Sequence, residues 1–458
     1  MILHVLLMLC VFSRCGNSLW SKSGLFERLS KAVPHLRPFS KPETTSSAAQ
    51  VPPAQDSSTS VLHKTIPPVL LAVLSCAQPS DASPLNPQSP AHRLLTPFFQ
   101  GWLVRAVDHS QDLSFIFIVG SFSSSEASDF TEHYIFSAAN HRGNALCHEE
   151  SFPDPDTVTV SGSSPSGPTL FPRLFPPVPL NVTWRAQGLG CFRFTDGSCS
   201  INFQLGPLSV KLKSKSALPW DPDGPPMTGP EGWLGYMPLL LPCHYFVHSV
   251  GSRCSYSLTL PSCSFRGNAL CHIEGNHGTF FPSGWIWSQA VSATNEASVS
   301  LVAGLFEIGG MQPLNVVLYV RSPRLGVRVF RTTDMDRIEI SDGVNRPLSS
   351  PVKRAGRVSL RARSSRDGLV VRLDLVAPLN SFGPPVHIPT RKGFSSQPGC
   401  RESYTAVAKV RIFSCSDSEF TDSNDEECGE LGDKQSKYRM FESFNIPMAC
   451  LEFGNSFV

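Results

Sequence analysis

The second half of the chain is a succession of short segments in which apolar and polar residues alternate. Within 357–363, Val358, Leu360 and Ala362 alternate with arginine and serine, and 369–376 follows the same pattern. A period of two is typical of a β-strand with one buried and one solvent-facing side. The segments predicted as strands are 297–308, 315–321, 326–331, 337–340, 357–363, 369–376 and 404–413. No long amphipathic helix competes with them, so the sequence predicts a mainly β fold of antiparallel sheets that pack together or close on themselves.

The folded part is predicted to begin near residue 91, after a stretch rich in Ser and Pro. The apolar segments 96–105 and 113–120 are expected to form its first pair of strands. Because 458 residues exceed one ordinary domain, we expect an N-terminal β-barrel lobe at 91–265 and a C-terminal lobe at 266–458. Insertions rich in Pro and Ser, or in acidic residues, are predicted as surface loops at 151–179, 214–230 and 414–438.

The composition narrows the class of partner. Charged residues make up 17% of the chain and the formal charge is +2, whereas binding to nucleic acid requires a basic excess that neutralises phosphates. The 30 phenylalanines and 40 prolines fit an apolar ligand, or equally a Phe-rich core. The 14 cysteines include no Cys-x-x-Cys pair, and His244-x-x-x-His248 lacks the glutamate of a zinc helix. We therefore expect neither nucleic acid nor a metal as a partner.

The amino terminus has the composition of a two-part leader. Residues 1–18 are a short apolar core followed by Arg14 and small residues, as in a signal peptide. Residues 19–90 are rich in Ser, Thr, Pro and basic residues and poor in acids near their start, as in a transit peptide. This order predicts a plastid reached through the secretory route, as in apicomplexans; the alternative is a secreted protein with a disordered linker. The apolar run 66–77 is too short to span a membrane.

One stretch, 272–289, concentrates ionisable and aromatic residues. It contains a carboxylate, an amide and two imidazoles, followed by a turn and a Trp-x-Trp segment. Trp285 and Trp287 are two residues apart, so in a strand their indoles share one face. The sequence therefore predicts polar chemistry beside an aromatic wall.

A heptapeptide, Arg-Gly-Asn-Ala-Leu-Cys-His, occurs identically at 142–148 and 266–272. Two copies are too few for a solenoid. The flanking sequences diverge at once, so a duplicated half and a local accident of the sequence both stay open.

Further short motifs are spread over about 96–454. They are Phe-Gln-Gly-Trp at 99–102, Gly-Trp-Leu-Gly at 232–235, Pro-Cys-His at 242–244 with His248, Glu-Gly-Asn-His-Gly at 274–278, Phe-Pro at 281–282, Trp-Ile-Trp-Ser-Gln at 285–289, His-Ile-Pro-Thr at 387–390, Cys-Arg-Glu-Ser-Tyr at 400–404 and Ala-Cys-Leu-Glu at 449–452. In composition and in order this series resembles the tocopherol cyclase family, and the block at 274–289 is its most specific part. Gly275 and His277 depart from the family's pattern, which has Lys and Trp at those places.

The resemblance implies a two-lobed, lipocalin-like antiparallel β-barrel. It also implies an isomerase (an intramolecular lyase) that closes the chromanol ring of vitamin E from a prenylated benzoquinol, without a cofactor. A proton is added to the prenyl double bond nearest the ring, and the phenol oxygen captures the tertiary cation. A hydrophobic prenylquinol is then the substrate, and peripheral contact with a plastid membrane or lipid particle is expected, without a transmembrane span.

Within that reaction the residues of 272–289 receive roles. Glu274 is the predicted proton donor, because a carboxyl against apolar surface keeps its proton. His272 or His277 would relay or accept the phenol proton, and Asn276 would orient the substrate oxygen or the acid. The lysine that Gly275 replaces would be a partner for Glu274. The predicted substrate-binding residues, including indoles that stabilise the cation through their faces, are Trp102, Phe281, Trp285, Trp287 and Gln289.

Structural interpretations compete with these roles. Glu274 and Asn276 would also suit a tight turn before Gly278, and Trp287 would suit a plain core position. The functional alternative is a barrel of the same fold that binds a prenyl lipid without chemistry.

Overall fold

The computed structural model of the chain describes ten ranges, all within one compact unit, Ala77–Val458. They are 97–124, 130–163, 181–195, 197–221, 229–232, 241–306, 312–341, 356–364, 368–415 and 438–457. The predicted signal peptide and transit-like leader, 1–90, lie outside the described residues, as does most of the acidic insertion. No helix among the described residues is long and apolar enough to cross a membrane.

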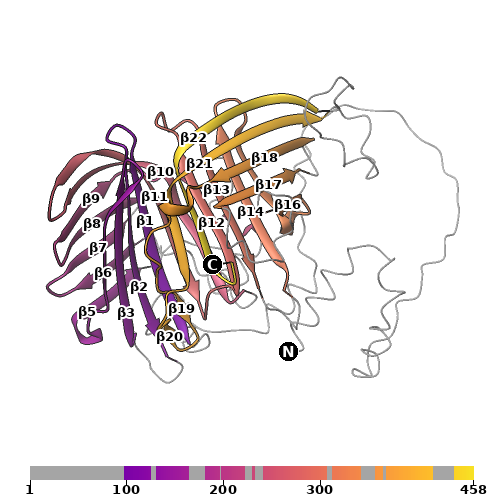
Figure 1. Cartoon of the computed structure of the whole chain (residues 1–458). Coiled ribbons are helices and arrows are strands. Elements are labelled where there is room, and N and C mark those ends of the chain that lie inside the picture. Colours follow the sequence, from indigo (N-terminus) through magenta and orange to yellow (C-terminus); the bar gives the residue numbers. More distant parts are fainter. Residues whose placement is uncertain are drawn as a thin grey trace, which may run out of the picture. The chain divides into compact units, whose positions relative to one another are not determined.

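Two large antiparallel sheets follow one another along the chain (Figure 1). The first has 11 strands in the order β4-β3-β2-β1-β11-β10-β9-β8-β7-β6-β5, and the second has nine in the order β15-β14-β13-β12-β22-β21-β18-β17-β16. The strands of the first sheet are β1 (Phe98–Asp108), β2 (Leu113–Ser123), β3 (Glu132–His141), β4 (Asn144–Ser151), β5 (Val158–Ser163), β6 (Asn181–Ala186), β7 (Gly190–Thr195), β8 (Ser198–Leu205), β9 (Leu208–Ser214), β10 (Cys243–Thr259) and β11 (Ser264–Gly278). Those of the second sheet are β12 (Gly284–Val291), β13 (Ser298–Leu305), β14 (Leu314–Ser322), β15 (Gly326–Arg331), β16 (Arg337–Ser341), β17 (Arg357–Arg363), β18 (Leu369–Val376), β21 (Cys400–Cys415) and β22 (Tyr438–Asn455). A separate hairpin pairs β19 (Pro389–Thr390) with β20 (Gly393–Phe394). The expected fold class, mainly β with two antiparallel lobes, is confirmed.

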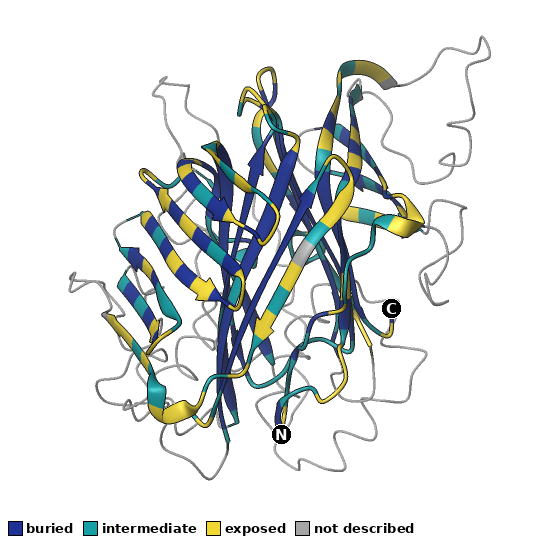
Figure 2. Cartoon of the chain, turned by 60° about the vertical axis from the view of Figure 1, so that its left-hand side comes forward, coloured by how far each residue is buried: buried dark blue, intermediate teal, exposed yellow. Residues whose placement is uncertain are grey.

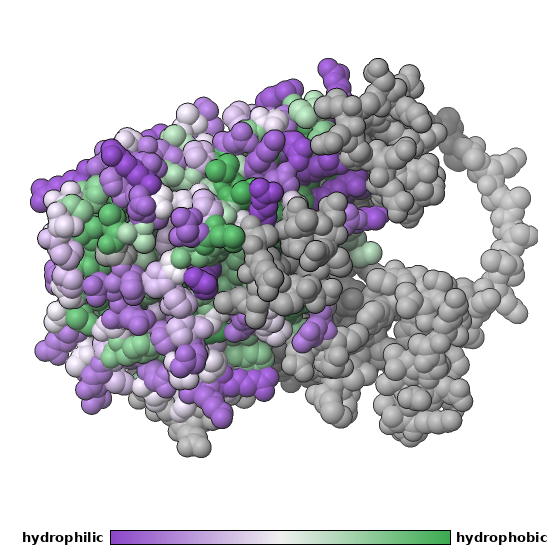
Figure 3. Space-filling model, viewed as in Figure 1, coloured by the Kyte–Doolittle hydropathy of each residue, from purple (hydrophilic) through white to green (hydrophobic). Residues whose placement is uncertain are grey.

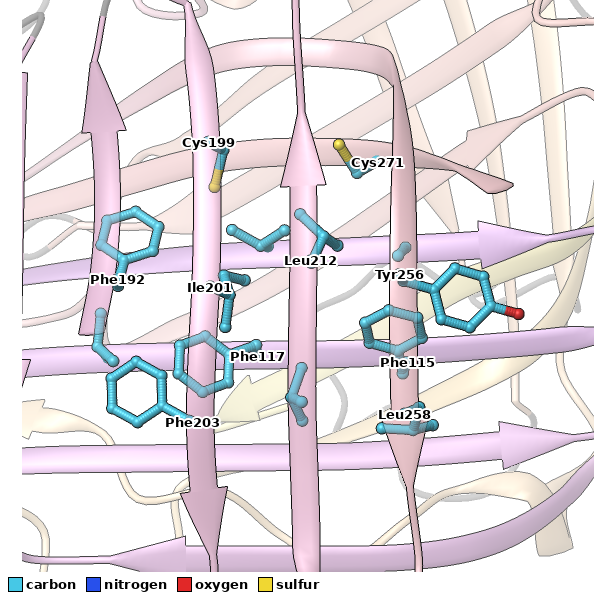
Figure 4. Packing of buried hydrophobic residues seen from close by; sticks show 14 of the residues in the cluster. Phe115, Phe117, Phe192, Cys199, Ile201, Phe203, Leu212, Tyr256, Leu258 and Cys271 are labelled. Carbon is cyan, nitrogen blue, oxygen red and sulfur yellow. The ribbon is translucent and has the colours of Figure 1, made fainter. Parts of the chain in front are cut away.

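The first sheet curls over a core of its own. Figure 4 shows Phe115 and Phe117 of β2 beneath Phe203 of β8 and Tyr256 of β10, where strands from the two halves of the sheet cross. The ring centroids of Phe117 and Phe203 are 4.8 Å apart. Irregular pairing of β10 with β11 between Val247 and Ser252 interrupts the ladder, and such bulges bend a strand. The curl therefore begins in the long strand β10.

The strands nearest the middle of the molecule are buried on both faces (Figure 2). Ten of the 11 residues of β1 are buried, whereas burial alternates along β6, β8 and β9. One face of β1–β3 is covered by the curl of its own sheet and the other by the second sheet. On the surface shown in Figure 3, hydrophilic side chains are interspersed with smaller apolar areas over the outer strands.

The second sheet encloses another apolar core, and its register confirms the alternation expected from the sequence. The predicted strands 357–363 and 369–376 coincide with β17 and β18, which pair with each other. Val358, Leu360 and Ala362 are all buried, as expected. The first expected strand pair is confirmed by β1 and β2.

Two boundaries differ from expectation. The lobes do not divide between 265 and 266, because β11 pairs with both β1 and β10 as a central strand of the first sheet. The division falls at 279–283, before β12. Part of the predicted loop 151–179 also forms the edge strand β5, whose backbone pairs with the antiparallel strand β6.

The two copies of the repeated heptapeptide differ in structure. In the first, Arg142 and Gly143 have positive φ angles of 51° and 79° and turn the chain from β3 into β4. In the second, the same letters are continuous strand in β11. His148 is exposed and His272 is buried. Tertiary context therefore decides the conformation, and the repeat does not mark a duplicated structural half.

Candidate active site

A largely apolar cavity of about 180 Å³ lies between the two sheets. Strands β1, β2, β3, β10 and β11 form one wall, and β12, β13, β14, β21 and β22 form the other. The segment before and within the β19–β20 hairpin closes a side through Val386, Ile388 and Phe394. Polar residues that line the cavity include Tyr245, Glu274, Asn276, Glu402 and Glu452.

Glu274 and Asn276 enter the cavity because β11 continues through them. Alternation in this strand places even-numbered residues of 272–278 on the side that faces the second sheet. Cross-strand neighbours point the same way: Leu103 lies opposite Glu274, and Tyr245 lies opposite Asn276. The competing interpretation of a tight turn at these residues is wrong, since they are paired strand residues.

Glu274 is the centre of a buried hydrogen-bond network. Its Oε2 accepts from the Tyr245 hydroxyl at 2.7 Å and from the Trp287 indole N–H at 3.0 Å, and it lies 2.7 Å from Nε2 of His272. The exposed fraction of Glu274 is only 2%. Burial, followed by the neighbouring Glu274, raises the pKa of Tyr245 well above its usual value, so this hydroxyl stays protonated as a donor. Because Trp287 belongs to the other sheet, the network joins the two lobes.

The aromatic wall is built on β12. Trp285 and Trp287 share one face, as predicted, and both line the cavity. Each indole N–H donates to a carboxyl: Trp285 to Oε1 of Glu452 and Trp287 to Oε2 of Glu274. Trp285 lies between Gly304 of β13 and Gly454 of β22, its direct neighbours across the sheet. Gly454 leaves room for the indole, since a Cβ there would lie within 2.3 Å of three of its ring atoms.

Glu402 and Glu452 are directly opposed on β21 and β22. Their carboxyl oxygens and the Cys400 sulfur all lie within 4.8 Å of one another, and all three residues are buried. Burial, followed by the charge of Glu402, raises the pKa of Glu452 well above its usual value. Burial also raises the pKa of Glu402, which accepts a hydrogen bond from the Tyr404 hydroxyl. Like charges this close disfavour double ionisation, so the pair holds at least one proton over a wide pH range.

A buried cation lies beside this acidic layer. Arg105 is fully buried on β1 and donates to the backbone and side-chain oxygens of Gln289 and to the carbonyl oxygen of Met448. Burial lowers the pKa of Arg105, and Glu402 acts in the opposite direction. Gln289, predicted to bind substrate, is thus the partner of Arg105 and is not among the cavity-lining residues.

Two other predicted residues lie on the far face of their strands. His277 stacks on Phe246 with a centroid distance of 5.2 Å, and burial followed by His244 lowers its pKa well below the usual value. The Trp102 ring packs on Phe194 and on His248, 5.0 Å away, inside the first sheet. The structure therefore directs these two side chains away from Glu274; Trp102 is nevertheless among the cavity-lining residues, whereas His277 is not.

The remaining predicted residues do converge. His272, Glu274 and Trp287 are in one network, and Phe281 packs edge-on against Trp285 at 5.3 Å beside the cavity. Asn276 also lines the cavity, and its predicted role in orienting the substrate oxygen or the acid stays a prediction. Of the predicted set, His272, Glu274, Asn276, Phe281, Trp285 and Trp287 are thus brought together.

Gly275 also faces away from the cavity. A Cβ at this position would lie 3.4 Å from Nε2 of His248 and from the Trp102 ring. A side chain there would point into the first sheet, so the idea that the replaced lysine would be a partner for Glu274 is wrong. Both departures from the family pattern lie on the face opposite the carboxyl.

Sequence reasoning assigned no role to Glu402, Glu452, Tyr245 or Arg105. Glu402 and Glu452 did fall within quoted motifs, at 400–404 and 449–452. The available signal is local: Glu452 follows Ala-Cys-Leu at 449–451 and precedes Phe453, and a carboxyl buried in such an apolar run requires a partner.

No protein-family model matches the sequence, and no curated protein matches it. Among solved structures, that of CghA with Sch210972 is 11% identical, with a TM-score of 0.48, over 78% of this chain and 88% of that chain. Kievitone hydratase from Nectria haematococca is 10% identical, with a TM-score of 0.40, over 82% of this chain and 94% of that chain. At these identities the likeness concerns the fold alone, and the tocopherol cyclase resemblance stays a prediction.

Proposed function

We propose that this protein is an enzyme that closes the chromanol ring of a prenylated benzoquinol, as the resemblance to tocopherol cyclases implies. One observation carries the proposal: the buried carboxyl groups of Glu274, Glu402 and Glu452 and two indoles line a largely apolar cavity. Such a cavity would accept a hydrocarbon tail, and its buried carboxyl groups are suited to moving protons. No group from outside the chain is required for the reaction.

The reaction needs a proton at the prenyl double bond and a proton acceptor at the phenol. Glu274, the predicted catalytic carboxyl, lies within the wall and exchanges a proton with the substrate in this proposal. The faces of Trp285 and Trp287 stabilise the cation, an effect of about 0.5 to 2 kcal/mol each. A hydrogen bond between Nε2 of His272 and Oε2 of Glu274 fixes the position of this carboxyl.

Product analysis tests the proposal. The chain from about residue 91, incubated with a prenylated benzoquinol, is expected to give a chromanol of unchanged mass, whereas hydration would add one water. Glu274→Gln is expected to slow turnover about a hundredfold or more, the usual order for a proton-transfer group. The matched control is Glu339→Gln, because Glu339 is a half-exposed carboxyl that pairs with Arg337 on β16. Tight binding of the quinol with no product from the unaltered chain would instead support the non-catalytic lipid-binding alternative.

The composition of the leader supports a place of action. We propose that the protein works in a plastid reached through the secretory route and collects its substrate at a membrane or lipid-particle surface. Fusion of residues 1–90 to a fluorescent protein is expected to label that organelle; release of the fusion into the medium would support a secreted protein.

A further inference from the structure

We infer that Glu402 and Glu452 act as one proton-sharing pair that protonates the prenyl double bond, while Glu274 on the opposite wall accepts the phenol proton. This inference rests on the proposed function and divides its proton chemistry between the two sheets. It replaces the prediction that Glu274 is the donor.

The first argument is the geometry of the pair. Glu402 and Glu452 are direct cross-strand neighbours, so their side chains leave the sheet on the same side, about 5 Å apart at Cβ. Both line the cavity. Glu452 has an exposed fraction of 7% against 2% for Glu402, so Glu452 presents the more open carboxyl to a substrate, and Glu402 lies behind it.

The second argument is what surrounds the pair. Buried carboxylates require compensating cations or donors, and the neighbouring cation, Arg105, donates hydrogen bonds to Gln289 and Met448. Each member of the pair instead accepts one bond from a neutral donor, the Trp285 indole or the Tyr404 hydroxyl. Arg105 therefore acts on Glu402 through its charge and not through a hydrogen bond, and a shared proton relieves the repulsion between the two carboxyls. Burial raises the pKa of both carboxyls.

Burial and the neighbouring acids favour a proton on the pair, whereas the charge of Arg105 acts in the opposite direction on Glu402. The titratable or charged groups that act on the pair are Arg105, Glu274, Cys400, Tyr404 and Cys450. Burial raises the pKa values of Tyr404, Cys400 and Cys450, so these groups stay neutral. Glu274 adds negative charge, which further favours a proton on the pair.

Glu274 differs from the pair in its hydrogen bonds. A single oxygen, Oε2, receives the Trp287 N–H and the Tyr245 hydroxyl, and His272 Nε2 lies 2.7 Å away. Donors that converge on one carboxylate oxygen stabilise the form that accepts a proton. The two indoles therefore divide between the carboxyls: Trp285 contacts the donor pair and Trp287 contacts the acceptor.

The step balances without an external reagent. The double bond takes the proton of Glu452, so a C–H bond forms, the O–H bond breaks and a tertiary cation remains. The phenol oxygen forms the C–O bond to that cation, and its proton passes to Glu274. Return of this proton from Glu274 to the pair restores the starting state, and the substrate has been isomerised with no net change in composition.

Two substrates separate the donor from the acceptor. The first is a prenylated benzoquinol and the second is the same molecule with a methyl group on the cyclising oxygen, each incubated in D2O. The ether has no phenol proton to lose, so its tertiary cation returns a proton from an adjacent carbon to the carboxylate of the pair, and protonation is observed as deuterium that stays in the prenyl chain. We expect Glu452→Gln to lose both chromanol formation and deuterium entry about a hundredfold or more. Glu274→Gln is expected to lose chromanol formation while deuterium enters the ether within about threefold of the unaltered rate.

The opposite pattern, with deuterium entry lost in Glu274→Gln and retained in Glu452→Gln, would overturn the inference. Chromanol from the unaltered chain, together with full activity in Glu452→Gln, would also overturn it while leaving the proposed function intact. If the unaltered chain forms no chromanol and incorporates no deuterium, the proposed function itself fails. Circular dichroism and thermal melting of each isosteric variant establish that it is folded.

A pH profile supplies an independent readout. Chromanol formation is expected to fall as pH rises through the pKa of the pair, because the donor then loses its proton. Glu402→Gln removes the charge that raises the pKa of Glu452 and is expected to move this limb to lower pH by about one unit or more. An unmoved limb would refute proton sharing, as would a stoichiometric metal ion held by Cys400, Glu402 and Glu452 and required for turnover.

Discussion

Substitution of Gly454 by alanine is a direct test of how the aromatic wall is built. Gly454 of β22 is opposite Trp285, and a Cβ on it would lie 2.0 Å from Cε2 and 2.1 Å from Cζ2 of the indole. Real Cβ atoms essentially never approach a neighbour within 3.0 Å, and ordinary contact begins at 3.4 Å, so the indole must move by about 1.0 to 1.4 Å from the 2.0 Å separation. The indole is enclosed by Phe281 and by the sheet, so the movement displaces its N–H from Glu452.

We expect Gly454→Ala to destabilise the fold by about 1–3 kcal/mol, the usual cost of overpacking. Turnover is expected to fall about a hundredfold, since a displacement of about 1 Å in a catalytic wall has that effect. Urea unfolding measures the first quantity, chromanol formation the second, and tryptophan fluorescence reports the displaced indole.

The matched control is Gly101→Ala, another strand glycine in the cavity wall. Its Cβ would meet only the Val119 carbonyl oxygen at 3.6 Å, so stability is expected to stay the same or rise by up to about 1 kcal/mol. In a Trp285→Ala background, Gly454→Ala is expected to cost less than about 0.5 kcal/mol, because the clash has been removed. Equal costs of Gly454→Ala in both backgrounds would refute the contact as the cause.

Three further predictions concern stability and the far face of β11. Arg105→Met is expected to lower the free energy of unfolding by about 3–5 kcal/mol, because buried partners lose their donor. The control Arg253→Met, at an exposed position, is expected to stay within about 0.5 kcal/mol of the unaltered chain. Urea titration measures both variants, and equal losses would contradict a stabilising role of buried Arg105. The raised pKa of Glu452 means that the folded state binds its proton more tightly than the unfolded state. The stabilising contribution of Glu452 is therefore full below its unfolded-state pKa and is lost as pH rises through its folded-state pKa. The unfolding midpoint of the unaltered chain should fall from pH 5 to pH 8, and that of Glu452→Gln should fall by less. His277→Phe is expected to keep turnover within about threefold, and a hundredfold loss in a folded variant would return His277 to the site.

Much of the fold follows from local alternation. Strands β17 and β18 match their predicted bounds because one face of each is buried and the other faces solvent. Apolar and polar residues therefore alternate with a clear period of two. The shared face of Trp285 and Trp287 was predictable for the same reason, since both residues belong to one strand. Signals of this kind depend only on neighbours in the sequence.

The carboxyl pair depends on register, which local sequence does not determine. Glu402 and Glu452 are 50 residues apart, and bulges between Ser403 and Ala408 shift the pairing of β21 with β22 beyond them. A one-residue slip would turn one acid to the other face. The role of each acid therefore became visible only once the two strands were paired.

The two glycines in 272–278 obscured the period of two that a β-strand imposes on its side chains. Glycines at 275 and 278 suggested a turn, and a turn would have allowed Glu274, Asn276 and His277 to converge. As continuous strand, the segment must send Gly275 and His277 to one side and Glu274 to the other. The departures from the tocopherol cyclase pattern thus change the interior of the first sheet, around Trp102 and His248, and not the cavity. Since proton transfer depends on groups at the cavity wall, conversion of Gly275 to lysine should perturb the packing of the first sheet while the hydrogen bonds of Glu274 persist.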